Sequence, residues 1–189
     1  MKRCEWVSQD PLMIKYHDQE WGTPTHDDTS LFELLILEGM QAGLSWSTIL
    51  NKRENFRKVF DNFDYEKIAL YGDQKVENLL QDKAIIRNRL KIQSVITNAK
   101  EFIKVREEFG SFDKFIWNFV DKKPINNSFE HLSEIPANSE LSDTISKAMK
   151  KKGFKFIGTT IIYSYLQAIG ILNDHLTYCF RYDEIIKNY

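Results

Sequence analysis

Residues Leu31–Leu50 read LFELLILEGMQAGLSWSTIL, and this stretch decides how the rest of the chain is interpreted. On a helical wheel its first leucines, Leu31, Leu34 and Leu35, form one apolar face. Glu38 falls in the middle of that same face. A lone carboxylate in apolar surroundings is costly unless a partner satisfies it. The partner is a neighbouring protein group or a ligand, and this stretch alone leaves both possibilities open.

The ends of this stretch carry signals for two successive helices. Ser30 and Glu33 have the spacing of a capping box, which starts the first helix and turns Glu33 outward. Gly43 ends that helix, and Ser45 can cap the next one. Leu44 sits at the corner between them, where a leucine is either an exposed surface wedge or an ordinary core residue.

Composition and charge limit the classes of protein to consider. The 189 residues are enough for one domain or two small lobes, and 42% hydrophobic residues can fill a core. No apolar run is long enough to span a membrane, and the N-terminus lacks the apolar segment of a secretion signal. We therefore expect a cytoplasmic protein, in which two cysteines are not a stable disulfide. The net charge of −1 requires that any polyanion be held by a local patch.

Helical periodicity dominates the remaining sequence, and no alternating strand pattern is present. The sequence therefore predicts an all-α fold, in which Lys122–Ser139 is the only extended loop. A short helix, Pro11–Tyr16, is expected before the opening stretch. The helices expected after the first helix of that stretch are Trp46–Phe60, Asp64–Tyr71, Asp73–Gln81, Ala84–Glu108, Phe112–Val120, Ser142–Lys152 and Thr160–Ala168.

A lysine cluster precedes a glycine-bounded turn in the last third of the chain. Five lysines fall within nine residues without an acid between them: Lys147, Lys150, Lys151, Lys152 and Lys155. Gly153 and Gly158 bound the turn, and a helix then starts at Thr159 or Thr160 with its free N–H groups outward. A helix–hairpin–helix of this kind can hold a DNA phosphate without reading sequence. The alternative is a solvated helix end, where lysines also suit the helix dipole.

Two cysteines and two histidines have a composition suited to tetrahedral zinc. Twelve residues separate Cys4 from His17, and three separate His175 from Cys179, which would share one face of a helix. Four protein ligands leave no open position for water, so such a site would be structural and would tie the N-terminal segment to the last helix. The alternative is a pair of ordinary buried cysteines.

Long contiguous motifs resemble one known family. They are RCEWVSQDPL at residues 3–12, YHDQEWG at 16–22, LFELL and QAGLSW within the opening stretch, NKRENFRKVF at 51–60, KKKGFKFIGTT at 150–160, and NDH with Cys179 near the C-terminus. These motifs resemble the 3-methyladenine DNA glycosylase I family of bacterial repair enzymes over residues 3 to 180. The resemblance implies a helix–hairpin–helix DNA glycosylase fold with a structural Zn²⁺ held by Cys4, His17, His175 and Cys179.

The resemblance also implies roles for single residues. Glu38 matches the family's base-recognising carboxylate, and Ser164 matches a position beside the base pocket. Three aromatic residues match positions around the excised base: Trp6, Tyr16 and Trp46. Leu44 would fill the gap left in the base stack. The DNA backbone would be held by Lys151, Lys152, Gly153, Gly158 and Thr160.

Two positions depart from the pattern that the resemblance leads us to expect. Met13 stands where the family often has tyrosine, at the rim of the pocket. Asp174 is the acid nearest to where the wider superfamily places a catalytic aspartate, but it adjoins the ligand His175. We assign Asp174 no catalytic role.

The expected activity is hydrolysis of the bond between deoxyribose and 3-methyladenine in alkylated double-stranded DNA, after the nucleotide has been flipped into the pocket. We expect a monomer in which residues 1–189 act as one unit. Its parts are a zinc-tethered segment with the base pocket (1–50), a helical body (51–140), the lysine cluster and hairpin (142–170) and a zinc-ligand segment (171–189). Two alternatives are a non-catalytic DNA-binding module and a zinc hydrolase of another substrate.

Overall fold

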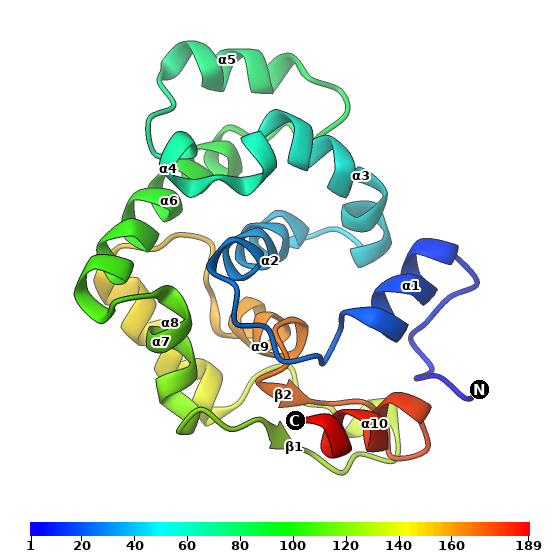
Figure 1. Cartoon of the computed structure of the whole chain (residues 1–189). Coiled ribbons are helices and arrows are strands. Elements are labelled where there is room, and N and C mark those ends of the chain that lie inside the picture. Colours follow the sequence, from blue (N-terminus) through cyan, green and yellow to red (C-terminus); the bar gives the residue numbers. More distant parts are fainter.

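The protein is mostly helical, as the sequence predicts (Figure 1). The structure is a computed structural model that describes residues 1–189. The helices are α1 (Pro11–Gln19), α2 (Asp28–Gln41), α3 (Trp46–Val59), α4 (Tyr65–Ile68), α5 (Asp73–Gln81), α6 (Arg89–Phe109), α7 (Phe112–Trp117), α8 (Glu140–Lys152), α9 (Thr159–Ala168) and α10 (Phe180–Asn188). None of these helices is both long and apolar enough to cross a membrane.

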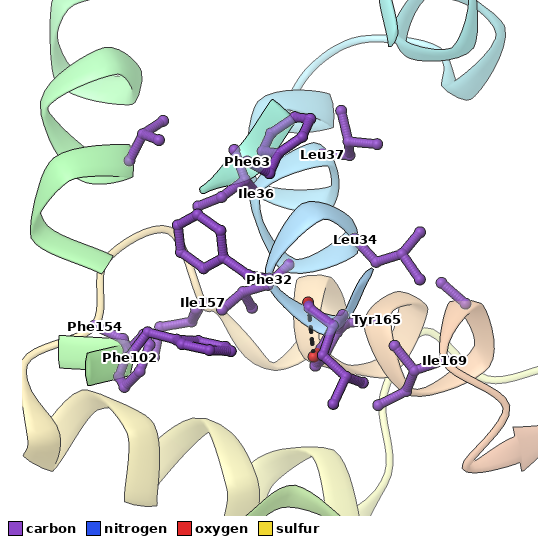
Figure 2. Close-up of a cluster of buried hydrophobic side chains, with 14 of the residues drawn as sticks. Phe32, Leu34, Ile36, Leu37, Phe63, Phe102, Phe154, Ile157, Tyr165 and Ile169 are labelled. Atoms are coloured by element: carbon purple, nitrogen blue, oxygen red, sulfur yellow. Dashed lines mark hydrogen bonds between the residues drawn. The ribbon is translucent and has the colours of Figure 1, made fainter. Parts of the chain in front are cut away.

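Helix α2 runs through the middle of the molecule, with α3, α6 and α9 packed around it (Figure 1). Each residue from Leu31 to Met40 is buried. Figure 2 shows Phe32 of α2 among side chains of the surrounding helices; its ring centroid lies 5.1 Å from that of Phe102 of α6. The hydroxyl of Tyr165 in α9 donates to the backbone oxygen of Leu31 at 3.0 Å. The first half of the stretch chosen from the sequence, Leu31 to Met40, is therefore the centre of the hydrophobic core.

The start of α2 differs from the predicted capping box. The N-cap is Asp27, whose carboxylate accepts from the Ser30 N–H at 2.8 Å. Glu33 is buried, and its oxygens accept from Arg53 Nε at 2.7 Å and Arg57 Nε at 2.9 Å. The outward orientation predicted for Glu33 is wrong because α3 covers that side of α2 and supplies both guanidinium groups.

A short parallel strand pair also departs from the expected all-α fold. Strands β1 (Ile125–Asn126) and β2 (Leu172–Asn173) pair through bonds such as Ile125 N–H to Ile171 O at 2.8 Å. Two residues a strand are too few to leave an alternating pattern in the sequence. The pair ties the loop after α7 to the segment after α9. Phe129 and Ile135 of this loop, on either side of the 3-10 turn Leu132–Glu134, pack against the apolar cluster that contains Cys4.

Several helix boundaries differ from prediction. Helix α1 continues to Gln19, α4 ends at Ile68, and α8 begins two residues early at Glu140. The helix expected from Ala84 begins at Arg89, because Asn88 is the N-cap and its side chain accepts from the Lys91 N–H. Helix α7 ends at Trp117 and continues only as a turn of 3-10 helix, Asn118–Val120. Helices α8 and α9 form the predicted hairpin.

Candidate functional site

A cavity of about 230 Å³ opens between the N-terminal segment, α1, α2, α3 and α9. Its lining residues are Trp6, Tyr16, Trp21, Glu38, Gln41, Trp46, Leu132, Ile135, Ser164 and Gln167. The structure thus brings together Glu38 and four residues predicted around it from distant parts of the chain. The walls are mainly apolar and aromatic, which is typical of a site for a flat organic ligand.

Glu38 is the charged group of this cavity. Glu38 is only 4% exposed, and its carboxylate makes no hydrogen bond or ion pair with another protein group. Burial disfavours the charged form and raises the pKa of Glu38 from 4.5 to about 8. A cationic ligand placed beside the carboxylate would reverse this effect and favour its ionised form. The sequence left open whether a protein group or a ligand satisfies Glu38. No protein group does so, and the carboxylate is therefore available to a ligand.

Aromatic rings stand around this carboxylate. The ring centroids of Tyr16 and Trp46 lie 5.1 Å apart, and those of Trp6 and Trp21 lie 4.9 Å apart in an edge-to-face arrangement. Burial and the neighbouring Glu38 raise the pKa of Tyr16, so its hydroxyl stays protonated and can donate. The buried indole N–H groups of Trp6 and Trp46 have no protein acceptor. Faces of such rings attract a cation through their quadrupole.

Several lining residues were not predicted from the sequence. Gln41 and Gln167 each lie three positions after a predicted site residue on the same helix, so helical spacing could have identified them. Trp21 belongs to the aromatic N-terminal segment, whereas Leu132 and Ile135 come from a loop without periodicity and left no signal.

The predicted position of Met13 differs from the one in the structure. It was expected at the rim of the pocket, but its side chain is buried in a second apolar cluster with Tyr16, Leu50 and Leu176, and it does not line the cavity. The physical reason is its place on α1: three positions before Tyr16, it points into the packing between α1 and its neighbours.

Asp174 is fully engaged within the protein. Its carboxylate accepts from Asn127 Nδ2 at 2.6 Å, Tyr163 Oη at 2.6 Å and Gln167 Nε2 at 2.7 Å. The residue is buried and does not line the cavity. It orients Gln167, which does line the cavity, and this arrangement agrees with assigning Asp174 no direct chemical role.

A groove leads from the cavity to the hairpin. It has a volume of about 170 Å³ and is lined by Glu38, Gln41, Ala42, Gly43, Leu44, Thr160, Ile161 and Ser164. Leu44 is 39% exposed at the corner after α2, where Gly43 has a φ of +79°. Leu44 is therefore a surface residue, as the wedge interpretation requires. The groove joins the cavity to the N-terminus of α9.

The hairpin residues differ in their exposure to solvent and in whether other protein groups bind them. Lys151 and Thr160 are exposed, and Gly153 ends α8 with a φ of +105°. Gly158 is the N-cap of α9 and carries no side chain to satisfy the first N–H groups of that helix. Lys152, by contrast, is held on the protein, because its Nζ lies 2.7 Å from a Glu108 carboxylate oxygen and 4.7 Å from the centre of the Phe109 ring.

The four predicted metal ligands converge in one buried cluster. Their donor atoms all lie within 4.8 Å of one another. Cys4 Sγ lies 3.6 Å from His175 Nδ1, and Cys179 Sγ lies 3.4 Å from His17 Nε2 and 3.6 Å from His175 Nδ1. The segment from His175 to Cys179 is a turn leading into α10 and not the helix considered from the sequence. The cluster could hold a metal ion.

The remaining ring nitrogens of this cluster have partners of their own. His17 Nδ1 lies 2.7 Å from an Asp18 carboxylate oxygen, and His175 Nε2 lies 3.0 Å from the Trp21 backbone oxygen. Such contacts fix the tautomer, so that His17 presents Nε2 and His175 presents Nδ1 to the centre of the cluster. The cluster also joins the N-terminal segment to the chain just before α10.

Comparisons with known proteins agree on one family. The model of the methyladenine glycosylase family matches residues 6–182. The chain is 52% identical to DNA-3-methyladenine glycosylase 1 of Escherichia coli over 96% of this chain and 97% of that protein. It is 44% identical to the DNA-3-methyladenine glycosylase of Haemophilus influenzae over 94% and 96%. The structure of 3-methyladenine DNA glycosylase I from Staphylococcus aureus, solved for its recognition of 3-methyladenine, has a TM-score of 0.93 at 36% identity and covers 96% of this chain and 97% of that one.

Proposed function

This chain belongs to the methyladenine glycosylase family, and from that premise we propose that it is a DNA-3-methyladenine glycosylase, a hydrolase of the N-glycosidic bond in alkylated double-stranded DNA. The observation that carries the proposal is Glu38: a buried carboxylate without a protein partner, set among aromatic rings in a cavity. A site of that kind is complementary to a flat cation.

Methylation at N3 makes the adenine of a nucleotide a cation, which is already a good leaving group. The enzyme therefore needs to find the base more than to protonate it. Glu38 accepts hydrogen bonds from the N–H groups of the base and complements its charge, and the rings of Trp6 and Trp46 stack on it. Tyr16 donates a further hydrogen bond, and Ser164 stands at the side of the pocket. Neutral adenine lacks the charge that offsets the burial of this carboxylate.

The nucleotide must leave the duplex before the pocket can hold its base. Leu44 is exposed at the mouth of the groove, and it fills the space left in the base stack. The N-terminus of α9, with Gly153, Gly158 and Thr160, holds a phosphate of the backbone. Lys151 adds charge, and Lys152 contributes once it exchanges Glu108 for a phosphate. The released product is 3-methyladenine.

The metal of the four-residue cluster is Zn²⁺ in this proposal. Tetrahedral zinc with Zn–S bonds of about 2.3 Å and Zn–N bonds of about 2.0–2.1 Å separates sulfur and nitrogen ligands by about 3.5 Å. Three sulfur–nitrogen distances in the cluster, of 3.4 to 3.6 Å, support that assignment. Four protein ligands leave no position for water, so Cys4, His17, His175 and Cys179 would hold a structural ion.

The proposal extends to the setting of the enzyme. The whole chain acts as one glycosylase unit, as a monomer, in the cytoplasm. The two alternatives predict other behaviour: a non-catalytic hairpin module binds duplex DNA and releases no base, and a zinc hydrolase of another substrate needs water on the metal. A cavity with an unpartnered carboxylate would serve no purpose in a pure binding module, which argues for catalysis.

The testing experiment measures base release from methylated duplex DNA, with the products separated by chromatography. The wild type is expected to release 3-methyladenine and to leave 7-methylguanine. Glu38→Gln should lower the rate roughly 10²-fold or more, comparable with the loss of a preorganised electrostatic group. Glu107→Gln, at an exposed glutamate of α6, is the matched control and should behave as wild type. Unchanged release by Glu38→Gln would refute the role of Glu38, and no release by wild type would favour the binding module.

A further inference from the structure

Lys91 is a buried lysine that the proposed chemistry does not use. It lies in the first turn of α6 and is 7% exposed, although lysines are rarely buried unless paired. No carboxylate partners it. Its Nζ instead donates to the backbone oxygen of Met40 at 2.9 Å and to that of Ala42 at 2.7 Å.

These two oxygens belong to the C-terminal end of α2. The last carbonyl groups of a helix have no partner within the helix, and they form the negative end of its dipole. The carbonyl between them, that of Gln41, accepts from the Leu44 N–H at 2.6 Å. Three successive carbonyl groups at the end of α2 and its C-cap are thus satisfied, two by the lysine and one by the Leu44 N–H.

The same end of α2 forms part of the site. Glu38 and Gln41 line both the cavity and the groove, and Ala42, Gly43 and Leu44 line the groove next to Thr160. Lys91 lines neither. Its own backbone is fixed, because its N–H donates to the N-cap side chain of Asn88. The ammonium group therefore connects a rigid point at the start of α6 to the corner that carries Leu44.

From this geometry we infer that Lys91 is a positioning residue for base excision. It holds the Gly43–Leu44 corner in the position from which the Leu44 side chain can enter the duplex. The inference rests on the proposed function. The ammonium has a second effect: it offsets the negative end of α2 where DNA phosphates approach the groove. Burial lowers the pKa of Lys91. The two carbonyl groups that accept from its ammonium oppose this effect, because they stabilise the charged form.

The test compares duplex excision with binding of the free base. In Lys91→Met the apolar stem remains and both donors are lost. Single-turnover release of 3-methyladenine from duplex DNA at saturating enzyme should fall about tenfold to a hundredfold, because small misplacements of a positioning group have effects of this size. Binding of free 3-methyladenine, followed by tryptophan fluorescence, should stay within about threefold of wild type, because the pocket groups remain. Lys91→Arg, which keeps donors and charge, should retain more activity than Lys91→Met.

Two further variants separate positioning from general stability. Lys100→Met, at an exposed lysine of the same helix, should match wild type in both assays. Because Lys91 acts through Leu44, Leu44→Ala combined with Lys91→Met should lose much less than the product of the two single losses. All rates are measured below the melting transition of every variant.

The outcomes distinguish the inference from the function on which it rests. Wild-type rates in Lys91→Met, equal losses in free-base binding and in excision, or multiplicative losses in the double variant would each overturn the role of Lys91 while leaving the glycosylase proposal intact. A wild type that releases no base would overturn both.

Discussion

At the scale of single residues, Glu38 makes the stability of the fold depend on pH. Its pKa is about 8 in the folded protein, against 4.5 for an exposed glutamate, so between these values the folded state binds more protons than the unfolded state. Stability therefore falls as pH rises through that range. Glu38→Gln removes this loss. The variant should melt at nearly the wild-type temperature at pH 5 and at a higher temperature at pH 8. The corresponding gain in unfolding free energy at pH 8 is about a few kcal/mol.

Melting curves at several pH values check this expectation. Glu107→Gln, with its exposed side chain, should show no such widening between pH 5 and pH 8. A difference between Glu38→Gln and wild type that stays constant with pH would mean that the carboxylate is not desolvated in the folded protein. The same substitution is expected to cripple excision, so a more stable and less active protein is the signature of a site residue kept for function.

Sequence could predict residues whose position depends on helical spacing. Glu38 is predictable because its neighbours fix which face of α2 is apolar. Tyr16 and Trp46 are predicted from the long motifs that carry the family resemblance. The predicted orientation of Glu33 is wrong because a single helix gives no information on what covers its other side. Arg53 and Arg57 of α3 lie there. Leu132 and Ile135 could not be predicted, because tertiary contacts alone bring their loop to the cavity.

At the scale of elements, the hairpin should show the salt dependence of phosphate contacts. Lys151 is exposed at the end of α8 and has no ion pair, whereas Lys152 is paired with Glu108. Lys151→Gln should weaken duplex binding equally for different sequences and reduce the slope of log K against log salt by about 1, the effect of one phosphate contact. Titrations of labelled duplexes over a series of salt concentrations measure this slope.

Lys187→Gln, at an exposed lysine of α10 outside the hairpin, is the control for general loss of charge. An equal change of slope in both variants would indicate a nonspecific charge effect and would argue against a hairpin contact. Release of 3-methyladenine at saturating enzyme should change little in Lys151→Gln, because the lysine lines neither the cavity nor the groove.

Elements were predictable where their ends carry caps. Ser45 starts α3 with its side chain accepting from the Thr48 N–H, and Ser111 starts α7 in the same way. The predicted start of α6 is too early because Ile85 continues the apolar pattern. In the structure the Asp82 side chain accepts from the Ala84 N–H and holds a turn there, and α6 begins at Arg89. Strands β1 and β2 exist only as a pair 47 residues apart, which no local pattern reveals.

At the scale of the whole molecule, the four-residue cluster joins parts of the chain that are far apart in sequence. Cys4 and His175 are 171 positions apart, and the first ten residues contain no helix or strand. If Zn²⁺ holds this cluster, its binding energy is part of the folding energy. The N-terminal segment that carries Trp6 would then be ordered by the metal, and the base cavity would depend on the ion through structure alone.

Cys4→Ser should therefore lose the metal, melt at a lower temperature and keep partial excision activity when it is assayed well below its melting transition. Metal content by atomic emission, melting curves and base release at low temperature are the three measurements. Wild-type protein treated with a chelator should behave in the same way, and added Zn²⁺ should restore its melting temperature and rate together. A Cys4→Ser protein that is fully folded, with an intact melting transition, yet has no measurable excision would instead place the metal at the reaction itself.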